Sequence, residues 1–455
     1  MSTHTLAELR PRLANRIVGP EDPGWDEARR AWNLAVDQHP AVVARPESAD
    51  DVVAVVEVAR EHHLRVAPQG TGHGASPRSS LERSVLVDTS RMNAVEIDPE
   101  RRRVRLQAGA QWQHVVAPAA EHGLAGLAGS AGDVCVTGYA LGGGSGWMAR
   151  RYGMAANSIR AAEVVTADRG LVRADADNEP DLFWALRGGG GSFGVVTALE
   201  LELFPVRELY AGVLFWPQER ATEVLGAWGE WTVTVPDEMT SLGRLLNFPP
   251  FEEIPEPVRG RSFVAVEAAW LGDEAGGAEV LGPLRALGPE MDTFATIPPP
   301  GLAGLHMDPP EPVPGGGDGM LLDDLPKTAT DALVATAGPG TDSPLTSIEI
   351  RHLGGAVGRP GPDHGALGPI DAPYLVFAVG PAMTPEMMAA VTARVGEVQR
   401  VLAQWDGGRF LTFTERPGQT ERMFPDDTYR RLREVKGRYD AGNLIQANHE
   451  IAPAS

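Results

Sequence analysis

The pattern of apolar and polar positions divides the chain into two regions. From about Pro46 to Pro205, short apolar runs alternate with amphipathic segments, and turn residues separate them. Apolar runs of this length predict strands, and a spacing of three and four predicts helices. We expect helices over 49–59, with Ser48 as a cap, 114–122 and 180–186, and strands over 64–67, 84–88, 95–97, 104–108, 162–167, 171–173 and 195–204.

From about Val206 the alternation changes. Longer strands are predicted near Ala211–Trp216, Ser262–Trp270, Thr346–Leu353 and Tyr374–Val379, with helices near Ala221–Trp231, Gly277–Leu287 and Pro385–Leu402. This order indicates an α+β region with an antiparallel sheet and helices on one face. Pro298–Asp318 holds seven prolines and predicts a long irregular loop. The chain closes with a predicted helix over Asp427–Arg438 and a tail over Tyr439–Ile451.

Composition narrows the possible partners. The 455 residues carry a formal net charge of -21, which argues against binding to nucleic acid or to an anionic membrane surface. No apolar run is long enough to span a bilayer, and Met1–Arg10 lacks the layout of a secretory signal. One cysteine gives no sign of an oxidising compartment, and the two lysines suggest a high-GC genome. We therefore expect a bacterial cytoplasmic protein that acts on a small molecule.

A glycine-rich turn at Pro68–Ser76 follows the strand over 64–67. Its glycines alternate with other residues, so backbone N–H groups can converge on one point, as they do around phosphate oxygens. His73 lies within this turn, and no second His or Cys lies at a metal-ligand spacing from it. Our hypothesis is that the turn holds a pyrophosphate and that His73 contacts, or is bonded to, a cofactor. The alternative is a glycine-rich turn with an incidental surface histidine.

A second glycine cluster spans Gly129–Trp147. Glycine at this density is tolerated where a flat or charged ligand lies against the backbone. Gly144-Ser145-Gly146 lacks the third glycine of a dinucleotide fingerprint, because that position is Ala149. No clear strand precedes the cluster and no acid follows at the required place, so NAD binding is not favoured.

Together these motifs resemble the FAD-linked oxidases of the vanillyl-alcohol oxidase type, in particular the berberine-bridge-enzyme-like branch. The resemblance rests on five segments in order: Gln69–Gly74; Val134–Gly146; Arg151–Gly153 with Asn157; Asp181–Gly191 with Gly194–Thr197; and the tail with Tyr439, Asp440, Asn443, Leu444 and Asn448. It implies an α+β, two-domain fold with an FAD-binding domain of the p-cresol methylhydroxylase (PCMH) type. The expected division is an FAD domain over 1–207, a substrate domain over 208–409 and a closing segment over 410–455 that returns to the FAD domain.

The resemblance also implies site roles. His73 matches the histidine that bonds covalently to the flavin 8α-methyl group, a link that would raise the reduction potential. The glycine turn would hold the FAD pyrophosphate, Gly138–Gly146 would line the isoalloxazine, and Val196 would lie on the adenine side. The full expected cofactor set is His73, Gln69, Gly70, Thr71, Gly72, Gly74, Ser130, Val134, Gly138, Gly142, Gly143, Gly144, Gly146, Asn157, Val196 and Asn448.

Two departures from the family pattern bear on chemistry. Many relatives have a second covalent link through a cysteine at the position of Ala131, so we expect a single link here. Cys135 aligns elsewhere and is expected to be a small buried core thiol. Val134 matches a valine that accompanies open oxygen access, which favours an oxidase producing hydrogen peroxide. Relatives often carry a basic tyrosine in a late strand, where this chain has Phe410 and Thr412.

The missing tyrosine leaves the catalytic base open. His352 and Glu349, on a predicted strand, and Tyr139, in the glycine cluster, are our candidates. Strand alternation places Glu349 and Arg351 on one face and His352 on the other, so an ion pair and a capping histidine form the alternative. Further pocket candidates are Tyr152, Trp147, His306 and Tyr374. The expected activity is oxidation of an alcohol, amine, phenol or sugar with O₂; the rivals are a dehydrogenase or redox-neutral cyclase, and a non-catalytic flavin- or ligand-binding protein.

Overall fold

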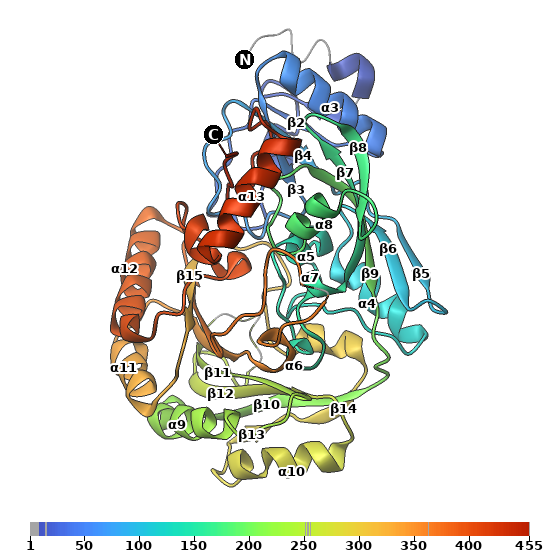
Figure 1. Ribbon diagram of the computed structural model, residues 1–455. Coiled ribbons are helices and arrows are strands. Elements are labelled where there is room, and N and C mark those ends of the chain that lie inside the picture. The colour runs from blue at the N-terminus through green and yellow to red at the C-terminus, as the bar shows by residue number, and fades with distance from the viewer. Residues whose placement is uncertain are drawn as a thin grey trace.

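The computed structural model describes residues 9–13, 16–250, 252, 254, 256–362 and 364–454 (Figure 1). Most of the Met1–Arg10 segment considered above lies outside these ranges. Within them the strands form three sheets, with helices packed around them, as expected for an α+β protein. No helix of the described residues combines the length and apolar character needed to cross a membrane.

The first sheet carries the glycine turn. Its strand order is β1-β2-β4-β3, and β4 pairs in parallel with both β2 and β3. Helix α3 begins after Ser48, whose hydroxyl accepts a hydrogen bond from the Asp51 N–H, and it packs against β3 and β4. The elements are β1 (Ile17–Val18), α2 (Trp25–Ala28), β2 (Val42–Ala44), α3 (Ala49–Glu61), β3 (Arg65–Gln69) and β4 (Ser84–Asp88).

The second sheet is antiparallel, with the order β5-β6-β9-β7-β8. Both predicted hairpins form, and Gly123 and Gly188 adopt the positive φ expected just after a helix. The elements are β5 (Val95–Asp98), β6 (Arg103–Gln107), α4 (Trp112–Glu121), α5 (Val136–Leu141), α6 (Ala149–Tyr152), α7 (Ala155–Ser158), β7 (Ile159–Thr166), β8 (Gly170–Asp175), α8 (Pro180–Leu186) and β9 (Val195–Glu202).

The third sheet is antiparallel and larger, with the order β13-β10-β12-β11-β16-β17-β15 and β14 paired to β10. Helices α9–α12 cover its outer face, and the other face turns toward the rest of the molecule (Figure 1). The elements are β10 (Leu209–Pro217), α9 (Ala221–Thr232), β11 (Met239–Asn247), β12 (Ser262–Trp270), α10 (Glu274–Arg285), β13 (Met291–Asp292), β14 (Ala295–Ile297), β15 (Gly315–Leu322), α11 (Lys327–Ala337), β16 (Ser347–His352), β17 (Tyr374–Pro381) and α12 (Pro385–Val401).

The predicted loop over Pro298–Asp318 is wrong at both ends. Pro299–Gly304 forms a short 3₁₀ helix, and the glycines from Gly315 onward begin strand β15. These glycines serve close packing, because a Cβ at Gly316 would lie 2.8 Å from the sulfur of Met388 in α12. The pattern also gave no sign of strand β11 or helix α11.

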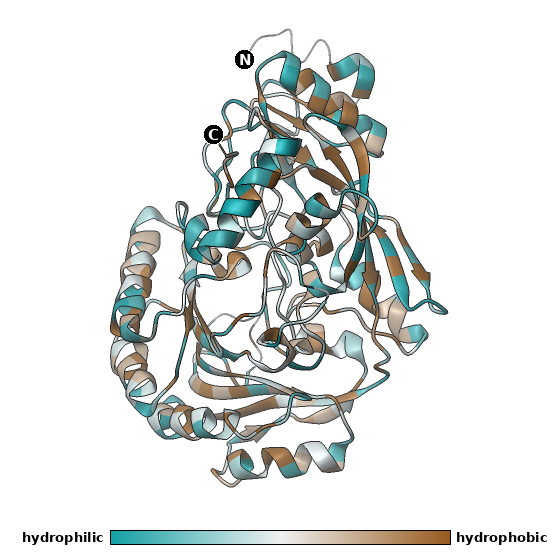
Figure 2. Ribbon diagram, in the orientation of Figure 1, coloured by the Kyte–Doolittle hydropathy of each residue, from teal (hydrophilic) through white to brown (hydrophobic). Residues whose placement is uncertain are grey.

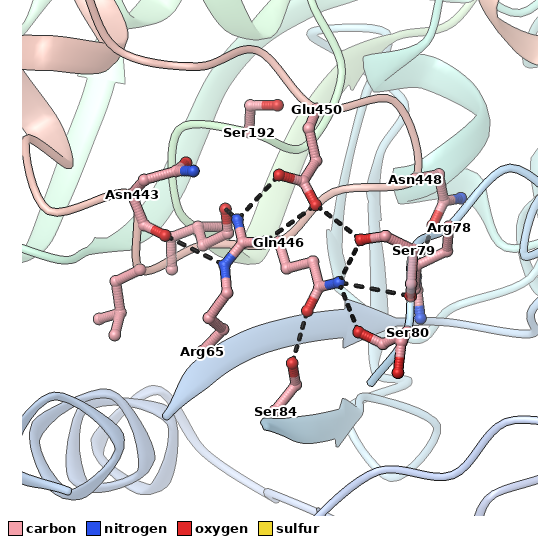
Figure 3. A network of polar contacts seen from close by, with 12 residues as sticks. Arg65, Arg78, Ser79, Ser80, Ser84, Ser192, Asn443, Gln446, Asn448 and Glu450 are labelled. Carbon is pink, nitrogen blue, oxygen red and sulfur yellow. Dashed lines mark hydrogen bonds and ion pairs between the residues drawn. The ribbon is translucent and has the colours of Figure 1, made fainter. Parts of the chain in front are cut away.

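The closing segment packs on the first sheet. Helix α13 (Asp426–Tyr439) contacts α8, and Figure 2 shows a strongly hydrophilic outer face on it. The tail then forms a parallel bridge between Ile445 and Val66 of β3. Arg65 binds both carboxylate oxygens of Glu450 at 2.9 and 3.0 Å (Figure 3). The last residues therefore lie beside the strand that carries the glycine turn.

A buried ion pair fixes this tail. Lys436 and Asp440 form an ion pair on α13, and both side chains are fully buried. The ammonium also donates to the carbonyl of Ser192 at 2.7 Å, and the carboxylate accepts from the N–H of Ile445 at 2.8 Å. The ammonium therefore satisfies a carbonyl of the segment before β9, and the carboxylate satisfies an N–H of the tail.

Replacing Lys436 by methionine should lower the free energy of unfolding by about 3–5 kcal/mol, because Asp440 would remain buried without its counter-ion. Lys327 provides the control: its side chain is 61% exposed and pairs with Asp331, so Lys327→Met should cost about 0–1 kcal/mol. Urea unfolding followed by circular dichroism measures both values. Equal losses for the two variants would contradict the assigned role of Lys436.

Candidate functional site

The glycine turn has a backbone that only glycine accepts at its centre. Gly72 has φ +86°, and a Cβ there would lie 2.9 Å from the Cα of Ala31. The carbonyl of Thr71 accepts a hydrogen bond from the Trp32 N–H at 3.0 Å, which holds the turn against the preceding segment. The turn is therefore fixed in shape by neighbouring backbone.

His73 is held on three sides. Its ring stacks on Trp32 with 4.2 Å between centroids, and Nδ1 lies 2.8 Å from the Thr71 hydroxyl. Nε2 lies 3.6 Å from a carboxylate oxygen of Asp133 and has no hydrogen-bond partner among the described residues. The Trp32 indole N–H donates to the same oxygen of Asp133 at 2.7 Å. Burial would raise the pKa of Asp133, but His73 and Trp32 outweigh burial and lower it.

Side chains behind the turn fix its two ends. The Gln69 amide oxygen accepts from Gln38 at 3.1 Å and from Arg78 at 3.3 Å, so this side chain holds the turn from behind. The Asn448 amide nitrogen lies 3.1 Å from where a Cβ of Gly74 would be. Asn448, a predicted cofactor residue, therefore lies beside the glycine turn.

Cys135 is a buried thiol, as expected. It donates to the carbonyl of Ala108 at 3.1 Å, and burial raises the pKa of the thiol. A Cβ at Gly70 would lie 2.4 Å from its sulfur, which explains why residue 70 is a glycine. Nearby Ser130 and Val134 are both half-buried.

Close packing explains most glycines of the Gly138–Gly146 stretch, which the resemblance predicts to line the isoalloxazine. Protein atoms crowd four of its glycines: Gly142 meets Thr412 and Leu411, Gly143 meets Leu367 and Phe410, Gly144 meets Tyr139, and Gly146 meets the carbonyl of Ala128. Gly138 alone of the predicted five is exposed, with nothing within 4 Å of a Cβ position. Most of these glycines therefore permit close packing of the chain on itself.

Several buried polar atoms around this cluster lack partners. Among the described residues they include Nε2 of His73, the hydroxyls of Thr137 and Tyr139 on α5, the hydroxyl of Thr412, which lies against Gly142, and the indole N–H of Trp147. Buried polar atoms in folded proteins nearly always have partners, so these atoms have hydrogen-bonding capacity for a ligand or for water. The flavin implied by the resemblance has a ring edge of alternating hydrogen-bond donors and acceptors, and the hydroxyls of Thr137, Tyr139 and Thr412 match it in chemistry.

A chain of buried charges lies on the inner face of the large sheet. His306 Nδ1 lies 2.6 Å from Glu267, and its Nε2 lies 2.9 Å from Glu349. Arg351 donates to both oxygens of Glu349 at 2.9 and 3.1 Å, and Arg244 donates to Glu267 at 2.9 Å. We call these five residues the charge chain. They come from β11, β12, β16 and the segment before β15, and strand register places Arg244 opposite Glu349.

The pKa values in the charge chain follow from this pairing. Burial and Arg244 would lower the pKa of His306, but Glu267 and Glu349 outweigh them and raise it to about 9. Burial would raise the pKa of Glu349, but Arg351 and His306 hold it well below its usual range. At neutral pH, His306 is therefore an imidazolium between two carboxylates.

His352 lies on the opposite face from Glu349, as strand alternation requires. Its ring stacks on Tyr374, and its Nε2 accepts a hydrogen bond from Arg150 at 2.9 Å. Burial and Arg150 lower the pKa of His352 to about 3. Glu349 and His352 therefore lie on different faces of the strand, as the alternation predicts, and they are alternative candidates for the base.

Tyr139 lies on the Glu349 side. Burial raises the pKa of its hydroxyl well above the usual value, although the nearby Arg351 opposes this. Arg351 also lies over the ring of Phe413, with 4.8 Å to the centroid. The Phe410–Phe413 stretch, which the resemblance predicts in a strand, contains a 3₁₀ helix over Leu411–Phe413. Of the candidate catalytic residues, the structure thus brings Tyr139 and Glu349 together through Arg351.

Asn157 and Val196 have structural contacts. The side-chain oxygen of Asn157 accepts from the Met154 N–H at 2.9 Å at the start of α7. Val196 is buried in β9 as part of the largest hydrophobic core. These contacts do not assign either side chain to a ligand.

Sequence reasoning missed five members of the site, among them Arg244 of the charge chain and Thr137 on α5. Trp32 and Asp133 meet His73 only through folding, from segments about 100 residues apart in the chain. Glu267 could have been found, because it interrupts the apolar strand Ser262–Trp270, and a carboxylate in such a strand needs a buried partner.

Comparison with known proteins supplies independent evidence. A family model described as an FAD binding domain matches residues 40–175. (R)-6-hydroxynicotine oxidase from Paenarthrobacter nicotinovorans is 33% identical over 205 residues, 45% of each chain. An uncharacterised FAD-linked oxidoreductase of Bacillus subtilis is 26% identical over 97% of this chain and 99% of its own. The alignments cover about half the length of the first curated relatives.

Solved structures show the same fold over the whole chain. The crystal structure of 6-hydroxy-D-nicotine oxidase from Arthrobacter nicotinovorans superposes with a TM-score of 0.85 at 23% identity, over 97% of this chain and 98% of that one. The predicted two-domain PCMH-type α+β fold is confirmed, and the names of the relatives agree with the expectation of an enzyme. Residues 40–175 therefore match an FAD binding domain, and the whole chain shares the fold of the nicotine oxidase.

Proposed function

We propose that this protein is an FAD-dependent oxidoreductase that oxidises a small organic substrate between the second glycine cluster and the charge chain. The observation that carries the proposal is the group of unpaired buried polar atoms on His73, Thr137, Tyr139 and Thr412. When bound, FAD supplies a two-electron acceptor for hydride from a substrate carbon. The relatives' names, which include oxidases, support the same reaction class.

The protein's own residues would hold this cofactor at both ends. The backbone of Gly70–Gly74 offers N–H groups for the pyrophosphate, and the Asn448 amide lies beside Gly74. Thr137, Tyr139 and Thr412 offer hydrogen bonds to the polar ring edge. We retain the division into an FAD domain over 1–207 with 410–455 and a substrate domain over 208–409. The pairing of Ile445 with Val66 supports the return of the closing segment.

We propose one covalent bond to the flavin, through His73. The unpaired Nε2 supports it, and Asp133 at 3.6 Å would stabilise positive charge on the ring. Ala131 cannot form a second link. Val134 supports oxygen access, so we propose that O₂ restores the oxidised cofactor and is reduced to hydrogen peroxide.

The charge chain does not provide a general base. Glu349 accepts hydrogen bonds from Arg351 and His306, and both ring nitrogens of His306 face carboxylates. His352 faces away, and the raised pKa of Tyr139 keeps its hydroxyl protonated at neutral pH. Tyr139 therefore acts as a hydrogen-bond donor. Glu415 has a pKa raised to about 7 by burial, but its contacts are with Ser76 and Asp318.

This arrangement favours an amine over an alcohol as substrate. An alcohol must lose its O–H proton as hydride leaves, and this needs a base. A neutral amine needs none, because its nitrogen lone pair stabilises the cation that forms as hydride leaves. The similarity to a protein named for 6-hydroxynicotine, itself an amine, supports the same class.

Amines should be oxidised with a kcat/KM roughly 100-fold above that of matched alcohols, since a general base is worth roughly 10²–10⁴-fold to an alcohol. Anaerobic stopped-flow bleaching of the flavin absorbance measures both, and peroxide is assayed after air is admitted. Equal rates for the two classes would contradict the amine assignment. Absence of bleaching with either class would favour a binding protein, and bleaching without reoxidation in air would favour a dehydrogenase.

His73→Ala should release the flavin on acid precipitation. The wild-type pellet should stay yellow because one covalent bond remains, whereas the variant should leave its colour in the supernatant. Absorbance of the supernatant at the flavin maximum, compared with the pellet digested by protease, measures the bound fraction. Ala131→Ser is the control at the position of the usual second link and should behave as wild type. A colourless wild-type pellet would refute the link.

His306→Asn should remove part of the pH dependence of stability. The folded pKa of His306, about 9, lies above the ordinary value of 6.5, so its stabilisation is complete below about pH 6.5 and is lost as the pH rises through 9. Between pH 6.5 and 9.5, wild type should lose about 1–3 kcal/mol more unfolding free energy than the variant. Urea unfolding at both pH values gives the difference. His122→Asn, at an exposed position, should leave the wild-type slope unchanged; an unchanged slope in His306→Asn would rule out the charged state.

A further inference from the structure

Arg78 lies behind the glycine turn and has no acidic partner. Its Nη2 donates to the carbonyl of Pro68 at 2.9 Å, its Nη1 to the amide oxygens of Gln38 and Gln69 at 3.3 Å, and its Nε to the Asn448 amide oxygen at 2.9 Å. All of these acceptors are neutral. Among the described residues, no ion pair or hydrogen bond joins Arg78 to a carboxylate.

A neighbouring arginine, in contrast, does have an acidic partner. Arg65, on the same strand system, binds both oxygens of Glu450 (Figure 3). Burial lowers the pKa of Arg78 to about 10, and no nearby charge opposes or adds to that effect. A guanidinium removed from water without a counter-ion is costly, so an anion bound from outside would stabilise it.

The contact with Asn448 gives Arg78 a second effect. Because the Asn448 oxygen accepts from Nε and Nη2 of Arg78, the amide nitrogen of Asn448 is turned away from Arg78. That nitrogen lies beside Gly74, 3.1 Å from the place a Cβ would occupy. Arg78 therefore fixes which end of the amide the glycine turn meets, and that end is a donor.

We propose that Arg78 is a positioning residue for the FAD pyrophosphate: it supplies the positive charge behind Gly70–Gly74 and orients the Asn448 amide as a donor toward the phosphates. Its own N–H groups are engaged, so it acts through Asn448 and through its charge. The inference rests on the proposed function. It explains how a chain with a net charge of -21 can hold a pyrophosphate, which is itself negatively charged, at this turn.

The test measures reversible flavin binding in the full-length His73→Ala chain, which lacks the proposed covalent link. Arg78→Gln in this background should raise the Kd for FAD at least about tenfold, the equivalent of about 1.4 kcal/mol. The Kd for riboflavin, which has the ring and the ribityl chain without phosphate, should change less than about twofold on the same scale. Fluorescence titration gives both constants, and Arg78→Lys should recover part of the lost FAD affinity because it keeps the charge.

A second variant separates an effect of charge on FAD affinity from an effect on folding stability. Asn448→Asp places a carboxylate against Arg78, so FAD affinity should fall as in Arg78→Gln while the unfolding free energy is kept or increased. Arg83→Gln is the control: this exposed arginine lies in the same connecting segment and donates to the His63 carbonyl, so it should leave both constants unchanged.

Three results would overturn the proposal. They are equal losses of FAD and riboflavin affinity in Arg78→Gln, unchanged FAD affinity in that variant, and unchanged FAD affinity in Asn448→Asp. Failure of the His73→Ala parent to bind any flavin would overturn the proposed function together with this inference. Flavin binding by the parent with no Arg78 effect would overturn the inference alone.

Discussion

The carboxylate of Glu349 is the contact on which the inner face of the large sheet depends. It accepts hydrogen bonds from Arg351 on its own strand and lies 2.9 Å from His306, which arrives from the proline-rich segment before β15. Removing any one partner would leave a charge buried alone, which is far costlier than the pair is favourable. The pairing therefore decides the position of the proline-rich segment and leaves none of the three groups free to move a proton.

The other half of the site is determined by backbone packing. Gly72 lies against Ala31, Gly70 against Cys135 and Gly146 against the carbonyl of Ala128, each too close for a side chain. These contacts bring the ends of β3 and the start of α5 together, and they place His73 beside Trp32 and Asp133. A rigid turn of this kind keeps its N–H groups in place before a ligand binds, so binding costs little conformational entropy.

Local pattern predicted the elements wherever periodicity and end signals agreed. Helix α8 and strands β4 and β12 have the expected bounds, and the resemblance supplied the overall fold. Pattern failed at β15, whose opening glycines are typical of a loop but allow α12 and β17 to pack closely. In the site, alternation separated Glu349 from His352 correctly. It could not show that Arg150 would engage His352, or that Trp32 and Asp133 would meet His73, because those contacts form between distant segments.

Charged groups are paired with one another on the sheet side of the site but not behind the glycine turn. This difference indicates what each side can bind. On the sheet, the three cations Arg244, His306 and Arg351 pair with the two carboxylates of Glu267 and Glu349, so every acid there is engaged and one positive charge is in excess. Behind the glycine turn, Arg78 has only neutral acceptors, so that side is incomplete until an anion binds. The proposed cofactor matches this difference in chemistry, because phosphates would supply the anion that Arg78 lacks and a flat ring with a polar edge would suit the hydroxyls of Thr137, Tyr139 and Thr412.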